Sequence, residues 1–119
     1  MPIYIVHLSS SRGYDAVREL KAAGVKIMVE TTPHYLLLTN DLLQGDEAQK
    51  YIMTPPLRRP GDNAALWKGV ESGDIEIIAT DHCAFTREQK LSSDSVISIL
   101  PGIPGSEELL PLVHTEGVG

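Results

Sequence analysis

Cysteine is almost absent from this sequence, since Cys83 is the only one among 119 residues. A single cysteine excludes an intramolecular disulfide framework and any zinc module built from several cysteines, and it fits a reducing compartment. Long apolar runs are also absent, because none approaches the roughly 20 residues that a membrane helix needs. The first seven residues lack the basic start and apolar stretch of a signal peptide. We therefore expect a cytoplasmic protein without a membrane partner.

Basic residues are scarce as well. Ten Lys and Arg stand against 16 Asp and Glu, which gives a formal net charge of -6. Nucleic-acid partners select for clustered Lys and Arg, and here these residues are scattered, so we expect no nucleic-acid partner. A small neutral or anionic substrate remains possible. The hydrophobic content of 42% and charged content of 22% are typical of an ordinary globular protein, and residues 1–119 suffice for one modest domain.

Apolar runs and helical patterns alternate along the chain. Residues 3–7, 25–29 and 75–80 are short runs rich in β-branched residues, typical of strands that are buried on both faces of a parallel sheet. Long irregular segments are predicted between about residues 30 and 60, with a possible helical turn at 41–43, and between residues 83 and 105. Loops of this length inside compact domains are usually functional.

Three helices are predicted between and after these strands. The first spans residues 13–23 and ends at Gly24, and its inner face is predicted to carry Ala16, Val17, Leu20 and Ala23. The second spans residues 63–72 and ends at Gly73, with Leu66, Trp67 and Val70 facing inward. The third begins at Ser106, but Pro111 falls late for a first turn, so this helix is either kinked or starts later.

This order of elements predicts an α/β fold with right-handed parallel crossovers. About three parallel strands with covering helices form an incomplete sheet, whereas a closed (β/α) barrel typically needs about 250 residues. The sheet is therefore either small and open or a part of a larger barrel.

Polar residues follow each predicted strand. They are His7, Glu30 with His34, and Asp81 with His82, and they should lie at one edge, where parallel α/β proteins bind ligands. Imidazole and carboxylate groups suit zinc and similar divalent ions, and a catalytic zinc usually has three protein ligands and a water. On the residues alone, Asp81 and His82 are as consistent with capping a turn as with binding a metal.

Six segments in this order resemble the cyclic amidohydrolases, which include dihydropyrimidinase, hydantoinase, allantoinase and dihydroorotase. The segments are residues 6–10 (VHLSS), 30–38 (ETTPHYLLL), 53–58 (MTPPLR), 66–67 (LW), 79–86 (ATDHCAFT) and 102–105 (GIPG). The resemblance implies a partial TIM (β/α) barrel from an enzyme that opens the amide bond of a small cyclic ureide or imide. It further implies a binuclear divalent-metal site, with two zinc ions that activate a hydroxide, and a homotetrameric complete enzyme.

The resemblance also implies roles for four residues of this sequence. A histidine in the position of His7 binds one metal, and an aspartate in the position of Asp81 binds the other and carries a proton from water to the departing ring nitrogen. The main chain at Thr54 and at Pro101 matches substrate-binding positions, although proline offers only a carbonyl there. His34 is expected either to pack or to form a loop hydrogen bond, and His82 either to hold the loop or to support the metal ligands, while Glu30 is expected to be a structural acceptor.

Within this family, residues 81–90 resemble the hydantoinases most. Dihydroorotases carry Asn at the position of Thr54 and commonly His at that of Phe85, and neither replacement can make the same contacts with a substrate carboxylate. Residues 101–105 (PGIPG), in contrast, are nearer to the allantoinase and dihydroorotase pattern. The alternatives are therefore an allantoinase or dihydroorotase-like enzyme, or a non-catalytic scaffold related to dihydropyrimidinase. Retention of both His7 and Asp81 counts against a scaffold.

Other metal ligands of the family are missing. The sequence has no His-x-His pair, and no lysine lies at a strand end where a carboxylated lysine could bridge two metals. The chain is therefore expected to be the later part of a barrel that cannot hold the two-metal site alone.

Overall fold

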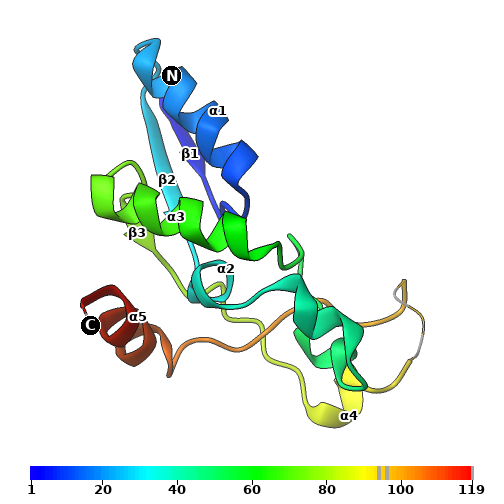
Figure 1. Cartoon of the computed structure of the whole chain (residues 1–119). Coiled ribbons are helices and arrows are strands. Elements are labelled where there is room, and N and C mark those ends of the chain that lie inside the picture. The colour runs from blue at the N-terminus through cyan, green and yellow to red at the C-terminus, as the bar shows by residue number, and fades with distance from the viewer. Residues whose placement is uncertain (94, 96, 119) are drawn as a thin grey trace.

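The computed structural model describes residues 1–93, 95 and 97–118. Three parallel strands lie in the order of the sequence: β1 (Ile3–Ile5), β2 (Ile27–Thr31) and β3 (Ile77–Ile78) (Figure 1). Ile3 pairs with Ile27, and Glu30 pairs with Ile77. This arrangement confirms the predicted α/β class with a parallel sheet. β1 and β3 are shorter than predicted, and β2 has the predicted length but begins and ends two residues later, so it includes Thr31.

Helix α1 (Ser11–Ala22) connects β1 to β2 and lies against them (Figure 1). Its first turn begins where the Ser10 hydroxyl accepts a hydrogen bond from the Gly13 amide at 3.1 Å. The predicted inner face is wrong in part, because the buried residues are Tyr14 and Val17, while Leu20 is 43% exposed. The helix is rotated because the Tyr14 hydroxyl donates to Asp74 at 2.7 Å, which turns this side chain toward the start of β3.

The segment between β2 and α3 contains helical turns; the one at 40–44 matches the turn expected at 41–43, whereas the others correct the prediction of an irregular segment. Helix α2 (Pro33–Leu37) is followed by the 3₁₀ turns η1 (Asn40–Gln44) and η2 (Ala48–Tyr51). Proline blocks the continuation of a strand, but it fits the first turn of a helix, where its missing N–H leaves no bond unmade. Pro33 therefore begins α2 instead of a loop.

Helix α3 (Pro60–Ser72) crosses next to α1 and leads into β3 (Figure 1). Leu66 is fully buried, and Trp67 and Val70 pack against the core, as predicted. The helix ends at Gly73, whose φ of +80° is a left-handed conformation that glycine adopts without strain.

Two further helices follow β3. The short α4 (Arg87–Lys90) lies within a region that was predicted to be irregular, and residues 94 and 96 of that region lie outside the described residues. Its N-cap is Thr86, whose hydroxyl accepts from the Gln89 amide at 3.2 Å. Helix α5 (Leu109–Val118) starts three residues later than Ser106, which places Pro111 in the first turn. Within the described part of the chain, no helix is both long and apolar enough to span a membrane.

The core lies on one face of the sheet. Along β2, Ile27, Val29 and Thr31 are buried, whereas Met28, on the opposite face, is 51% exposed. The prediction that the strands are buried on both faces is therefore wrong for this chain. Its Cα radius of gyration is 15.1 Å, above the about 13.5 Å expected for a compact domain of this length. The main apolar cluster comprises Leu8, Tyr14, Val17, Ile27, Val29, Tyr35, Leu36, Met53, Leu57, Leu66 and Ile75.

Candidate active site

The backbone is unusual at the carboxyl ends of the two outer strands. His7 follows β1 with a φ of +40°, and Asp81 follows β3 with a φ of +44°. Among the residues that the structure describes, these are the only non-glycine residues with a positive φ. L-residues in this conformation are strained, and such strain is concentrated at functional sites. The two predicted metal ligands are therefore the two residues that the fold holds in a strained conformation.

The position of His7 is fixed by the residue that follows it. The Leu8 amide donates to the Glu30 carbonyl at 2.8 Å, and the Thr31 hydroxyl donates to the Leu8 carbonyl at 2.7 Å. Leu8 is buried, so both main-chain groups are held in the interior. The middle strand thereby fixes the turn that carries His7.

The segment that leads to Asp81 is also bound by Thr31. The Ala79 amide donates to the Thr31 carbonyl at 2.9 Å, which aligns the chain two residues before Asp81. Thr31 is fully buried and thus binds, through its side chain and its main chain, the segments of both candidate ligands. The sequence analysis missed Thr31 because it ended the second strand at residue 29. A strand extended to residue 31 would have placed it at the ligand-binding edge.

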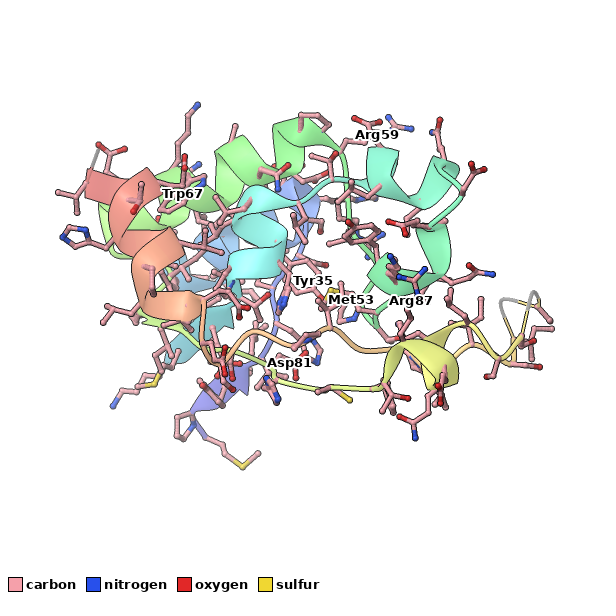
Figure 2. All side chains as sticks on the ribbon, turned by 90° about the horizontal axis from the view of Figure 1, so that it is seen from below. Tyr35, Met53, Arg59, Trp67, Asp81 and Arg87 are labelled. Carbon is pink, nitrogen blue, oxygen red and sulfur yellow. The ribbon has the colours of Figure 1, made fainter. Side chains whose placement is uncertain are left out.

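Tyr35 lies close enough to Asp81 to be affected by its charge. Burial raises the pKa of the Tyr35 hydroxyl well above its ordinary value, and the negative charge of Asp81 raises it further, although Arg58 opposes this. The hydroxyl donates to the Pro55 carbonyl at 2.6 Å. In Figure 2, Tyr35 and Met53 lie near the middle of the view, the exposed Asp81 lies below them, and Arg59 lies near the upper edge. Tyr35 therefore connects the surroundings of Asp81 to the segment after Thr54.

Thr54 and Pro101 line the same cavity of about 690 Å³. Its wall is mostly apolar, and its lining residues are Leu43, Gly45, Asp46, Ala48, Gln49, Tyr51, Ile52, Met53, Thr54, Pro56, Ile97, Ile99 and Pro101. The structure thus brings together the two predicted substrate-binding positions. His7 and Asp81 are not among the described residues that line this cavity.

Two other histidines bind the loop that leads to α5. His34 Nε2 lies 3.0 Å from the Pro104 carbonyl, and His82 Nδ1 accepts from the amides of Gly105 and Ser106 at 3.1 and 3.2 Å. The predicted loop hydrogen bonds are confirmed for both residues. Glu30 is also an acceptor, since it receives the hydroxyl of Tyr4.

The donor chemistry of His7 and Asp81 suits zinc, but the number of donors does not complete a site. No group of three or more His, Cys, Asp or Glu that could hold a metal occurs among the described residues. A catalytic zinc usually has three protein ligands. This chain can therefore supply one part of a metal site.

Parallel strands that alternate with helices, with polar residues after the strand ends, are the arrangement of one part of a (β/α) barrel. No protein-family model matches the sequence. A curated D-phenylhydantoinase from Escherichia coli K12 is 40% identical over 98% of this chain and 26% of its own length.

Solved structures give the same result. The chain matches a D-hydantoinase (dihydropyrimidinase) from Thermus sp. with 41% identity and a TM-score of 0.92, over 97% of this chain and 26% of that one. It matches a dihydropyrimidinase from Brevibacillus agri with 29% identity and a TM-score of 0.93, over 98% of this chain and 26% of that one. Over nearly its whole length, the chain is therefore similar to one part of the hydantoinases and dihydropyrimidinases. It spans about a quarter of the length of the relatives that it matches.

Proposed function

We propose that this chain is part of an enzyme that hydrolyses the amide bond of a small cyclic ureide or imide, with hydantoin and dihydropyrimidine as its substrate class. The observation that carries the proposal is the left-handed backbone at both His7 and Asp81, on either side of the buried β2. The names of the similar proteins, D-phenylhydantoinase and dihydropyrimidinase, support the same substrate class.

His7 and Asp81 would each hold a divalent metal ion, and two zinc ions would complete the site with ligands from outside these 119 residues. When bound, the metals supply Lewis-acid chemistry that polarises a carbonyl and makes water nucleophilic near neutral pH. His7 would contribute an imidazole to this set, on a turn whose next residue, Leu8, is bound by the Thr31 hydroxyl.

The Asp81 carboxylate would take a proton from the attacking water and give it to the ring nitrogen as the amide bond breaks. The positive φ of Asp81 sets the direction in which its side chain leaves the main chain. The main chain at Thr54 and Pro101 would hold the ring of the substrate in the cavity that the two residues share. Because proline has no N–H, the contact at Pro101 can be made only through its carbonyl.

Hydantoinase activity is favoured over dihydroorotase activity by Thr54 and Phe85. A threonine that lines an apolar cavity and a half-buried phenyl ring offer no charge or amide to a substrate carboxylate. Allantoinase is the second candidate, since Pro101 and Gly102 follow its pattern. An assay of hydantoin, dihydrouracil, allantoin and dihydroorotate in parallel distinguishes these activities.

The central test is Asp81→Asn in the complete enzyme. Asparagine keeps the size of the side chain but cannot carry the proton, so kcat for hydantoin or dihydrouracil should fall by roughly 10²- to 10⁴-fold or more. Steady-state kinetics, metal analysis and circular dichroism of the same preparations would measure the effect.

Asp15→Asn is the matched control, because Asp15 lies on the exposed side of α1. Its kinetics should equal those of the wild type. Near-normal turnover by a folded Asp81→Asn enzyme would disprove the role of Asp81. An inactive wild-type enzyme that binds no metal would favour the non-catalytic scaffold.

We further propose that the complete enzyme is a cytoplasmic homotetramer. The support is the resemblance of the six sequence segments to the family, together with a single cysteine that fits a reducing compartment. Light scattering on the complete enzyme would test the oligomeric state.

A further inference from the structure

Lys90 is a buried cation that the proposed chemistry does not use. Only 5% of the residue is exposed, although lysine is almost never fully buried unless it is paired. Its Nζ donates to the carbonyl oxygens of Ile52, Leu100 and Gly102 at 2.9, 2.9 and 3.1 Å. The three hydrogens of one ammonium group are thus bound by three main-chain carbonyls.

These carbonyls belong to the two segments that line the cavity of about 690 Å³ with Thr54 and Pro101. Ile52 lies two residues before Thr54, and Leu100 and Gly102 flank Pro101 on either side. The Gly102 amide also donates to the Ile52 carbonyl at 2.9 Å, so the segments are in direct contact. Lys90 therefore joins the main chain at both predicted substrate-binding positions.

Lys90 also connects these segments to the loop of Asp81. Lys90 is the last residue of α4, which begins six residues after Asp81. A Cβ atom placed on Gly102 would lie 2.8 Å from Cβ, Sγ and the carbonyl oxygen of Cys83, so the two loops touch at Gly102. The loop that carries Asp81 and the walls of the cavity are thereby held against each other.

The buried ammonium of Lys90 has both a cost and a benefit. Burial lowers the pKa of the Lys90 ammonium, which shows that the site disfavours its charge. An apolar residue of similar length would avoid the cost of burying a charge, but it would leave the Leu100 and Gly102 carbonyls without this donor and the Ile52 carbonyl with the Gly102 amide alone. An ammonium group fixes all three carbonyls around one point.

We propose that Lys90 is a positioning residue for substrate binding. It holds residues 52–54 and 100–102 at the spacing that lets Thr54 and Pro101 line one cavity. This inference rests on the proposed function. Because the main chain at these positions would hold the ring in the ground state and in the transition state alike, loss of Lys90 should act on KM more than on kcat.

The test compares Lys90→Met, Lys90→Arg and Lys50→Met in the complete enzyme. Methionine keeps the length of the side chain without donors, and arginine keeps the charge but places its donors in a plane. Lys50 is the control, since it lines the same small cavity of about 320 Å³ as Lys90 but pairs with Glu47. The readouts are KM, kcat, metal content and hydrogen exchange of peptides covering residues 50–56 and 98–104.

Lys90→Met should raise KM for hydantoin or dihydrouracil roughly 10- to 100-fold, as expected for a small displacement of binding groups. Metal content and kcat should stay close to the wild type, and exchange should rise in both peptides. Lys90→Arg should retain the fold and give a smaller increase in KM. Lys50→Met should match the wild type in every readout.

A folded Lys90→Met enzyme with an unchanged KM would overturn the inference. Loss of the fold in both Lys90 variants would also overturn it, because Lys90 would then be a general stabilising residue. Failure of the proposed function is distinguishable, since it would leave the wild-type enzyme itself without turnover of any cyclic ureide or imide.

Discussion

Thr31 links the two strained positions of the candidate active site. Its hydroxyl donates to the Leu8 carbonyl and its carbonyl accepts from the Ala79 amide, at 2.7 and 2.9 Å. It is fully buried, so neither bond competes with water. Groups that hold metal ligands in place commonly affect metal binding as much as the ligands' own chemistry does.

Replacing Thr31 by valine keeps the shape of the side chain and removes the hydroxyl. The Leu8 carbonyl would lose its donor, so the free energy of unfolding should fall by about 1–3 kcal/mol. In the complete enzyme, zinc affinity should fall roughly 10- to 100-fold, because the turn of His7 is no longer fixed. Urea denaturation and competitive zinc titration measure the two effects.

Thr115→Val is the control, because Thr115 is exposed on α5. It should change neither quantity. Unchanged zinc affinity in Thr31→Val, together with reduced stability, would limit Thr31 to a structural role.

The sequence predicted the place of His7 and Asp81, because a strand end is a local feature that periodicity and composition reveal. Their roles as metal ligands stay predictions. Thr31 and Lys90 could not be predicted in the same way, since their function lies in contacts between distant segments. The Nζ of Lys90 binds a carbonyl 38 residues earlier, and no pattern in the sequence shows that the two meet.

Among the helices, α2 depends on a neighbour for its stability. It has only five residues, too few for a stable isolated helix, and its last carbonyls need donors. Helix α3 supplies them: Asn63 Nδ2 donates to Tyr35 and Leu38 at 2.7 and 2.9 Å, and the Trp67 indole donates to Leu36 at 3.0 Å. Because α2 carries Tyr35 and His34, α3 also supports the candidate active site.

Trp67→Phe tests this dependence. Phenylalanine retains much of the packing but has no N–H, so the Leu36 carbonyl would be left without its donor. We expect a loss of about 1–3 kcal/mol in the free energy of unfolding, measured by urea denaturation. Lys68→Gln, on the exposed side of the same helix, should have almost no effect. Equal stability of Trp67→Phe and the wild type would mean that packing alone maintains α2.

Short helices and the orientation of helix faces were harder to predict from the sequence than the long helix α3. The sequence predicted α3 with its buried Leu66 and its stop at Gly73, because both signals are local. It missed α2, since Pro33 ends a strand as readily as it begins a helix. It also misplaced the inner face of α1, because the contact of Tyr14 with Asp74 joins residues 60 positions apart.

At the scale of the whole molecule, the sheet is covered on one face only. Tyr4 and Met28 are each about half exposed, and β1 and β3 form the two outer strands. Exposed apolar strands with unpaired edges favour association with another segment of chain. The similar proteins are about four times as long, which is consistent with further strands covering this face.

The isolated 119-residue chain should therefore bind little zinc and should not hydrolyse hydantoin or dihydrouracil. His7 and Asp81 are two ligands, whereas a catalytic zinc usually needs three, and the described residues contain no group of three donors. Metal analysis after dialysis and a ring-opening assay on the purified chain measure both properties, with the complete enzyme as the positive control. Stoichiometric zinc binding with turnover by the isolated chain would contradict the expectation that further ligands come from outside these 119 residues.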